Sequence, residues 1–395
     1  MQAGGAEPGG AASATQVPRP HMSRITRVEV GRRDYPLVGQ FKFFPAGARP
    51  TVLVRLTDAS GRQGCGQAVP VESWTYETVE SVESTLRIYL APAVLGAEPS
   101  DLAEVHARME RVIRPSFSVG QPLAKAAIDL ACHDLWGRQA GQPVCDLLGG
   151  ARSDEICLSW TINSRSLAQA QQLLEEGRAL GYESFNVKLG LPQTPAYDLD
   201  LVRLVTDFSP HGFHWGDANT SYDLATALQQ APRLADRGLA ALESPLPPNR
   251  IRAYQQLRSQ GALPILMDEG IVSPVEAEEF AALGMLDGIA MKVARCGGLW
   301  PAARIVEGMR RDNLRLFASG LTDPEWSLAA SIHLFAWAGL SLPAALNGPQ
   351  YLADRGTSDA AFRARADRIQ VPRGPGLGIT PDARALASLT VAAGA

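Results

Sequence analysis

Apolar and polar positions alternate along the first part of the chain. From Arg24 to about Gly66, Val, Ile and Leu recur at every second position, and the segment Asp-Ala-Ser-Gly at 58–61 separates two such runs. This period is typical of half-buried strands that are joined by turns. We therefore expect a strand meander at the start of the folded region.

From about 75 to 148 the apolar spacing changes to three and four, as at Ala127, Leu130 and Ala131. This spacing is typical of amphipathic helices, and Gly141 followed by Pro143 marks a helix end. Strands followed by helices predict an α+β domain over residues 23–150.

Beyond Ser153 short apolar runs alternate with Ala- and Leu-rich amphipathic segments. The apolar runs are ICLSWTIN, SFNVKLG, GFHWGDAN, LAALESP, LPILMDEG, GIAMKVAR and LRLFASG. Such runs are typical of buried parallel strands, and their alternation with helices indicates βα units. Seven or eight units close into a (β/α) barrel. A doubly wound open sheet is the rival architecture, but no Gly-rich phosphate loop follows the first strand.

A charged residue closes five consecutive runs. Successive members of this set are separated by 29, 26, 25 and 24 residues, and the set is Lys188, Asp217, Glu243, Asp268 and Lys292. One βα unit has about this length, so the five residues should end consecutive strands at the catalytic face of a barrel. A single acid at a strand end is often only a helix N-cap, but five in register favour a common site.

Three carboxylates side by side repel one another unless a cation neutralises them. Oxygen ligands without His or Cys suit Mg²⁺, or Mn²⁺, rather than zinc. A carboxylate substrate on such a metal has an acidified α-proton. Two flanking lysines can remove that proton from one face and return it on the other, because burial and a nearby cation favour the neutral amine.

Composition limits the partners of the chain. The 395 residues carry a formal charge of -4 without a Lys/Arg block, which argues against a nucleic-acid surface. No run approaches the roughly 20 apolar residues of a membrane span. Five scattered cysteines indicate reduced thiols, and residues 1–22 have the Gly/Ala/Pro-rich texture of a disordered tail rather than a secretory signal. We expect a cytoplasmic protein.

Several motifs together resemble the enolase superfamily in its muconate-lactonizing branch. The stretch AKAAIDLACHDLWGRQAGQPVCDLLGG resembles the first signature, and VKLG, GDAN, LESP, MDEG and MKVARCGGL resemble the catalytic and metal-binding pieces in order and spacing. The resemblance implies a modified (β/α)₇β barrel at 151–365 under an N-terminal α+β capping domain, with 366–395 returning to the cap. It also implies Mg²⁺ on Asp217, Glu243 and Asp268, with acid/base roles for Lys188 and Lys292.

Further site residues are expected from the same resemblance. The segment SGLTDPEWSLAAS is similar to the end of the seventh strand, where Asp323 would face the substrate as a catalytic acid, with Glu325 as a second candidate. Asn219, two residues after Asp217, and Glu269, directly after Asp268, are also expected to bind substrate.

The chain also departs from the pattern of the branch that it resembles. Lys-x-Lys is usual at the second strand, but Asn186 stands where the first lysine would be and is expected to contact substrate. The His/Asp dyad of mandelate racemases is missing, because MKVARCGG holds its place. The segment ALNGPQYL lacks the Asp-x-Asp of dipeptide epimerases, which disfavours a dipeptide substrate.

Two segments of the cap are expected to close over the barrel mouth, at 38–49 and 70–78. Their aromatic residues could exclude water from the site, or could only pack the interface between cap and barrel. The candidates are Phe41, Phe43, Phe44, Trp74 and Tyr76, with Phe117 as a weaker one.

Three functions remain open for such a chain. Two opposed lysines favour an isomerase, that is, a racemase or epimerase of an amino-acid derivative, or a cycloisomerase. The second hypothesis is a dehydratase of a hydroxy acid or hydroxyproline-type substrate, and the third is a non-catalytic scaffold. The expected partner is a small-molecule carboxylate, and the expected assembly is a homo-oligomer.

Overall fold

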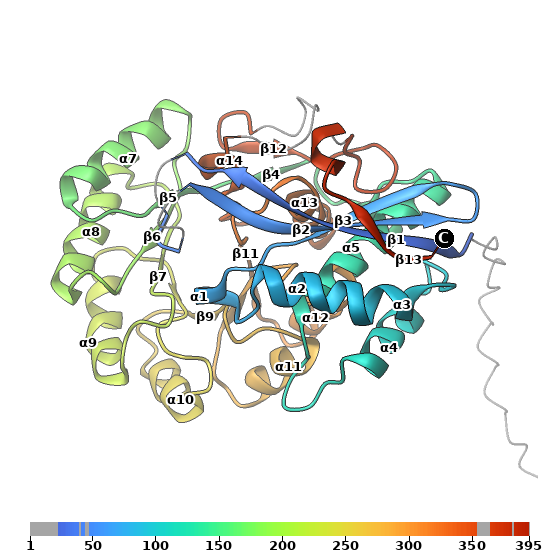
Figure 1. Ribbon diagram of the computed structural model, residues 1–395. Helices are drawn as coiled ribbons and strands as arrows, with labels where there is room; N and C mark the ends of the chain where they lie inside the picture. The colour runs from blue at the N-terminus through green and yellow to red at the C-terminus, as the bar shows by residue number, and fades with distance from the viewer. Residues whose placement is uncertain (1–22, 39–40, 44–46, 354–363, 381–382, 395) are drawn as a thin grey trace, which may run out of the picture.

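The computed structural model describes residues 23–38, 41–43, 47–353, 364–380 and 383–394 (Figure 1). The predicted tail at 1–22 and Phe44 lie outside these ranges.

The first part of the chain forms an antiparallel sheet with the strand order β13-β1-β2-β3. Its strands are β1 (Ile25–Pro36), β2 (Ala48–Asp58), β3 (Gln63–Ala68) and β13 (Thr390–Gly394). The strand meander predicted from the period-two pattern is therefore present. The last strand of the chain pairs with the first, so the C-terminal segment completes this sheet.

Helices pack on one face of this sheet, and the longest is α5 (Pro122–Ala140), which begins with a proline and ends at Gly141 in the left-handed conformation. It approaches β3 closely, because a Cβ at Gly66 would lie 2.1 Å from the carbonyl oxygen of Ala127. The other elements of this region are α1 (Glu72–Thr75), α2 (Val79–Thr85), the π-helical turn η1 (Leu86–Leu90), α3 (Ala91–Val94), α4 (Leu102–Val112) and α6 (Val144–Leu147). We call the antiparallel sheet and these helices the cap.

The second part of the chain forms seven parallel strands in sequence order. They are β5 (Trp160–Ile162), β6 (Phe185–Lys188), β7 (His214–Asp217), β8 (Leu242–Glu243), β9 (Ile265–Met267), β10 (Gly288–Met291) and β11 (Arg315–Ala318). Ala344 bridges to Leu158 before β5, and Ala345 bridges to Ser319 after β11, both in parallel. These two bridges close the sheet into a ring, so the predicted (β/α)₇β barrel is confirmed and the open sheet is excluded.

A helix follows each of the seven strands, and these helices surround the barrel (Figure 1). They are α7 (Leu167–Ala179), α8 (Pro195–Phe208), α9 (Leu224–Ala235), α10 (Ile251–Gln260), α11 (Pro274–Ala282), α12 (Leu299–Arg311) and α13 (Glu325–Ala338). Short elements complete the chain, namely α14 (Gly348–Tyr351), the pair β4 (Glu155–Cys157) and β12 (Arg368–Gln370), and the 3₁₀ turn η3 (Ala383–Leu386).

Apolar side chains fill the inside of the barrel. One cluster consists of buried residues from consecutive strands, namely Trp215, Ala241, Leu266, Ala290, Phe317 and Ala345. Successive side chains on a strand point to opposite faces, so residues two positions further along point inward as well. For the strands β7 to β11 those residues are Asp217, Glu243, Asp268, Lys292 and Ser319. The polar layer of the barrel therefore lies directly above its apolar layer.

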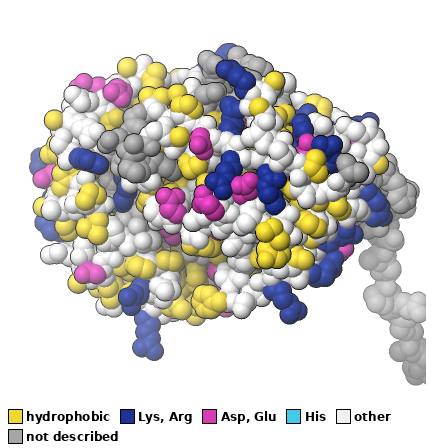
Figure 2. All heavy atoms as spheres, viewed as in Figure 1, with side chains coloured by type: hydrophobic (Ala, Val, Ile, Leu, Met, Phe, Trp, Pro, Cys, Tyr) yellow, Lys and Arg dark blue, Asp and Glu magenta, His cyan; other side chains and the backbone are white. Residues whose placement is uncertain are grey.

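The sequence predicts reduced thiols, mixed surface charge and no membrane span. In the part of the chain that is described, no helix combines the length and the apolar character that a membrane crossing needs. All five cysteines are free, and only Cys157 is not fully buried. On the face shown in Figure 2, Lys/Arg and Asp/Glu side chains are interspersed rather than separated into blocks of one sign.

Candidate active site at the barrel mouth

The five strand-end residues predicted from spacing lie around one end of the barrel. The register pairs Lys188 with Asp217 and Asp217 with Glu243, so these three are direct neighbours across β6, β7 and β8. Asp268 and Lys292 each follow their strand, β9 and β10, by one residue. The side chains of all five are at least nine-tenths buried, so the charges are gathered in a site that excludes most solvent.

Ion pairs connect these charges. Lys188 Nζ lies 2.5 Å from Asp217 Oδ2, and Lys292 Nζ lies 3.0 Å from Asp268 Oδ2. Arg295 Nε lies 3.2 Å from Asp268 Oδ1. Trp215 Nε1 donates to Glu243 Oε2 at 2.8 Å, whereas Glu243 Oε1 is buried and has no hydrogen-bond partner among the described residues.

Burial and mutual repulsion shift the pKa values of these groups. Burial, reinforced by Asp217, raises the pKa of the Glu243 carboxyl well above its usual range. Burial would also raise the pKa of Asp217, but the ammonium of Lys188 holds it below its usual range. Burial lowers the pKa of Lys188, yet the carboxylates of Asp217 and Glu243 outweigh burial and leave that pKa raised. The expected neutral amine at Lys188 therefore requires that another cation take over these carboxylates.

The donor chemistry of the site fits a hard divalent cation. Three buried carboxylates supply oxygen atoms only, and the unpartnered Glu243 Oε1 together with the raised pKa of that carboxyl indicates negative charge that lacks compensation. In the arrangement seen here, no three His, Cys, Asp or Glu side chains within the described ranges converge closely enough to hold a metal. Asp217 and Asp268 are turned onto lysines instead, so metal binding requires that these carboxylates rotate.

Two residues predicted to bind substrate lie beside the carboxylates. The backbone N–H of Asn219 donates to Asp217 Oδ1 at 2.9 Å, and its side-chain Nδ2 donates to Asp217 Oδ2 at 3.0 Å. The same Nδ2 donates to Glu269 Oε1 at 3.2 Å. Burial, followed by the charge of Asp268, raises the pKa of the Glu269 carboxyl. These contacts connect the ends of β7 and β9 across the site.

The aromatic residues of the cap cover this site, as expected of the two loops. Trp74 Nε1 donates to Glu269 Oε1 at 3.0 Å, and the Trp74 ring stacks on Phe43 with centroids 4.3 Å apart. Lys292 Nζ lies 5.0 Å from the centroid of the Trp74 ring, and Lys188 Nζ lies 6.0 Å from that of Phe41. An aromatic ring of the cap therefore lies over each lysine.

The other aromatic candidates do not contribute in this way. Tyr76 is 62% exposed, and Phe117 is completely exposed on the surface. The loop at 70–78 thus reaches the site through Trp74 alone among its aromatic residues.

The remaining predicted site residues are buried but not in direct contact with the carboxylate cluster. Asp323 accepts hydrogen bonds inside its own loop, from Ser327 Oγ at 2.7 Å and from the N–H of Leu321 at 3.1 Å, and burial raises its pKa. Glu325 accepts from the hydroxyl of Tyr35 in the cap sheet. Their roles toward a substrate stay predictions.

Asn186 lies in β6 two residues before Lys188, and its side chain is buried. Neither of its amide atoms has a hydrogen-bond partner among the residues that are described. The structure therefore holds a buried donor and acceptor where the branch usually has a lysine.

Three polar residues of the site were not assigned roles from the sequence. Ser319 directly follows β11 and accepts a hydrogen bond from Lys292 Nζ. Its position 27 residues after Lys292 continues the spacing of the other strand ends. Arg295 pairs with Asp268 and donates through Nη1 to the carbonyl of Trp74 at 3.2 Å. Lys42 lies between two aromatic residues in a cap loop, which no strand-end pattern identifies.

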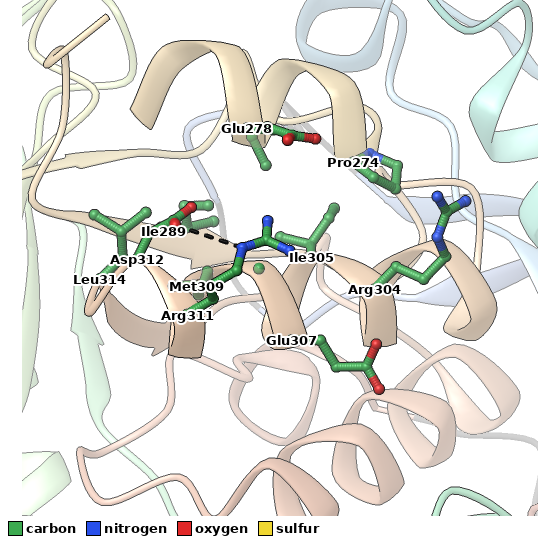
Figure 3. A pocket seen from close by; sticks show the side chains of 12 residues that line it. Pro274, Glu278, Ile289, Arg304, Ile305, Glu307, Met309, Arg311, Asp312 and Leu314 are labelled. Carbon is green, nitrogen blue, oxygen red and sulfur yellow. Dashed lines mark ion pairs between the residues drawn. The ribbon is translucent and has the colours of Figure 1, made fainter. Parts of the chain in front are cut away.

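Two cavities lie in different surroundings. One of about 200 Å³ is lined by Lys188 together with cap and barrel loops. The other, of about 170 Å³, lies between α11 and α12 and is lined by side chains such as Glu278, Arg304 and Arg311 (Figure 3). No predicted site residue lines the second cavity, so it does not belong to the barrel mouth.

Comparison with known families accounts for this arrangement. Residues 165–385 match the family model described as "Enolase C-terminal domain-like". Residues 23–149 match the model described as "Mandelate racemase / muconate lactonizing enzyme, N-terminal domain". The chain belongs to the mandelate racemase/muconate lactonizing enzyme family. The resemblance drawn from the motifs is thereby confirmed.

Relatives within this family are isomerases. The chain is 30% identical over 365 residues to muconate cycloisomerase 1 of Rhodococcus opacus, which covers 90% of this chain and 95% of that protein. It is 27% identical over 350 residues to the N-succinyl-L-Arg/Lys racemase of Bacillus cereus, with coverage of 87% and 90%. The crystal structure of a muconate lactonizing enzyme from Pseudomonas fluorescens, complexed with muconolactone, matches with a TM-score of 0.87 and 25% identity, over 94% of this chain and all of that one.

Proposed function

We propose that this protein is a divalent-metal isomerase that removes and returns the α-proton of a carboxylate substrate. The observation that carries the proposal is the placement of two lysines on opposite walls of one barrel mouth, with three carboxylates between them. Lys188 ends β6 and Lys292 follows β10, which are four positions apart in a ring of seven strands closed by residues 344–345. A planar intermediate between them would be accessible to one lysine from each face.

Asp217, Glu243 and Asp268 would hold the metal, with Mg²⁺ as the favoured ion. When bound, such an ion would stabilise the negative charge that develops on the substrate carboxylate as the α-proton leaves. The lysines would then be released from Asp217 and Asp268, with which they now pair, and could act as bases.

Residues around the lysines support their orientation and the exclusion of water. Ser319 accepts a hydrogen bond from Lys292, which fixes the direction of its ammonium. Trp74 and Phe41 lie over the two lysines and would separate the reacting atoms from bulk solvent. Asn186 and Asn219 could then hydrogen-bond the substrate on the side of β6 and β7.

The relatives favour an isomerase, since they include cycloisomerases and an amino-acid racemase. Among the residues that the structure describes, no contact in the site specifically favours the dehydratase hypothesis. We therefore place racemisation or epimerisation of an N-acyl amino acid first, with cycloisomerisation as the related outcome on an unsaturated acid.

The test follows the α-proton by NMR in D₂O with Mg²⁺ and each enantiomer of an N-acyl amino acid. The wild type should exchange the α-proton of both enantiomers and interconvert them. Lys188→Met and Lys292→Met should each abolish interconversion, while each variant still exchanges the proton of one enantiomer, a different one for each variant. Loss of a hydroxyl group from a hydroxylated substrate would instead support a dehydratase.

Arg203→Met, which removes an exposed cation from α8, is the matched control and should leave both activities unchanged. If Lys188→Met and Lys292→Met both interconvert the enantiomers at the wild-type rate, the two-lysine assignment is wrong.

A further inference from the structure

A cavity of about 350 Å³ lies at the amino-terminal end of the barrel, away from the carboxylate cluster. Its wall includes Phe213, which directly precedes β7, and Arg315 and Leu316, which begin β11. At their other ends the same two strands lead to Asp217 and Ser319 in the barrel mouth. The cavity and the proposed active site therefore lie at opposite ends of the barrel.

Apolar side chains form much of the wall of this cavity. Phe213 and Leu342 are partly buried and pack against the apolar cluster inside the barrel. Leu316 and Leu340 are also only partly buried and contribute to the same wall. Ligand pockets usually measure about 300–1,000 Å³ and are mainly apolar with a few polar groups. Both the volume and the wall therefore suit a small organic molecule.

The charged side chains in the wall are two arginines, Arg310 and Arg315, and none of the described residues that line it is an aspartate or a glutamate. Arg315 is exposed. The backbone carbonyl of Asp287 accepts a hydrogen bond from the N–H of Arg315 at 3.1 Å, but the carboxylate of Asp287 pairs with Arg258 at 2.9 Å. The nearest acid on the neighbouring strand thus leaves the guanidinium of Arg315 to the cavity.

Arg310 is held in place by groups that do not neutralise it. Its guanidinium lies 4.8 Å from the centroid of the Trp337 ring, and its Nη2 donates to the carbonyl of Ala338 at 2.9 Å. Burial and the nearby cation of Arg152 lower the pKa of Arg310, although the carboxylate of Glu307 opposes them. An anion in the cavity would therefore be favoured beside this guanidinium.

We propose that this cavity binds an amphipathic monocarboxylate, whose carboxylate pairs with Arg310 and Arg315 while its aliphatic or aromatic body lies on the apolar wall. The planar guanidinium matches the two oxygen atoms of a carboxylate, and the apolar wall removes the remainder of the ligand from water. The site goes beyond the proposed function, because a ligand at the amino ends of the strands takes no part in chemistry at their carboxyl ends.

Three simple ligands test the site with the Mg²⁺-loaded protein in titration calorimetry. Octanoate should bind saturably. Octanol, which lacks the charge, and acetate, which lacks the apolar chain, should each bind at least about tenfold more weakly. Arg310→Met and Arg315→Met should each weaken octanoate several-fold and leave the affinity for octanol unchanged. Because Arg315 is exposed, its replacement tests the site even if Arg310→Met unfolds.

Control variants locate the bound ligand. Arg315→Lys retains the cation and should keep most of the affinity for octanoate, and Arg203→Met removes an exposed cation from α8 and should change nothing. If Lys292→Met weakens octanoate and Arg315→Met does not, octanoate binds in the barrel mouth and the cavity assignment is wrong.

Three further results would overturn the site. They are the absence of saturable octanoate binding, equal affinity for octanoate and octanol, and unchanged affinity in both Arg310→Met and Arg315→Met. Sedimentation velocity should give the same mass for the wild type and Arg315→Met. A lower mass for the variant would show that this end of the barrel contacts a second copy of the chain instead of a small ligand.

Discussion

Replacement of Asp129 by alanine should weaken the junction between cap and barrel. Asp129 lies on α5 of the cap and has no exposed surface. Its Oδ1 accepts a hydrogen bond from the N–H of Leu299 at 2.6 Å, and Oδ2 lies 3.3 Å from the N–H of Trp300, so it caps the N-terminus of α12 from another part of the fold. His106 Nε2 lies 2.8 Å from the same Oδ2.

The free-energy cost follows from these contacts. Loss of a local N-cap costs about 0.5–2 kcal/mol. Removal of Asp129 also leaves the N–H groups of Leu299 and Trp300 without this acceptor, at about 1–3 kcal/mol each, and removes the hydrogen-bond partner of His106. Because these contributions overlap, we expect a loss of about 4 kcal/mol in the free energy of unfolding. Asp223→Ala removes an exposed cap from α9 and should cost about 1 kcal/mol.

Urea unfolding, followed by tryptophan fluorescence and circular dichroism, measures both losses. Burial would raise the pKa of Asp129, but His133 and His106 hold it below its usual range. A depressed carboxyl pKa contributes stability above the unfolded value of about 3.9 and loses it as the pH falls through the folded value. The difference between wild type and Asp129→Ala should therefore be largest near neutrality and shrink below about pH 4.

The α12 helix begins seven residues after Lys292, so Asp129→Ala should also lower turnover, whereas Asp223→Ala should not. A loss of stability no larger than that of Asp223→Ala would contradict the reasoning, because the long-range cap would then act as an ordinary local one.

Three further predictions concern the metal, a buried acid and the cap loop. Removal of divalent metal by EDTA should abolish α-proton exchange, and Mg²⁺ should restore it. Mg²⁺ should also raise the melting temperature, because an ion that binds the folded state stabilises it. Activity that survives chelation would exclude the metal assignment. Burial raises the pKa of Glu77 to about 7, so the unfolded state loses this proton at a lower pH than the folded state does. The free energy of unfolding of the wild type should therefore fall as the pH rises from about 4.5 to 7. Urea unfolding of Glu77→Gln should lack this part of the pH profile. Trp74→Ala removes a hydrogen bond to Glu269 and a stacking contact with Phe43. The KM for substrate should therefore rise about tenfold in steady-state assays. An unchanged KM would show that the cap loop does not contribute to binding.

The strand-end residues could be predicted because barrel geometry leaves a mark in the sequence. Four of the five inward-facing charges stand two positions after an inward-facing apolar residue, as Asp217 does after Trp215 and Asp268 does after Leu266, whereas Lys188 follows the polar Asn186. Side chains repeat every two residues within a strand, and the charges at the strand ends recur about every 25 residues. Both patterns can be recognised from the sequence alone. Ser319 obeys the same rule, and only its uncharged side chain kept it out of the predicted set.

The contributions of the cap could not be predicted in the same way. Lys42 and Trp74 reach the site because α5 packs tightly on β3 and is fixed to α12 through Asp129, which orients the whole cap. The first contact, of Gly66 with Ala127, joins residues 61 positions apart, and the second, of Asp129 with Leu299, joins residues 170 positions apart, so no local pattern records them. The sequence predicted that aromatic loops would close over the barrel, but which side chains face inward depends on tertiary contacts.

Asn186 shows why the reaction is harder to predict than the site. A lysine at this position would place a second ammonium beside Lys188 and favour loss of its proton. With asparagine there, the site holds a buried amide that has no hydrogen-bond partner among the described residues. Asn186 pairs with Thr161 on the neighbouring strand, and the buried hydroxyl of Thr161 has no hydrogen-bond partner among those residues either. Such groups are costly unless a ligand or water satisfies them. The positive charge near Lys188 comes instead from Lys42 of the cap, since both side chains line one cavity between the cap and the barrel.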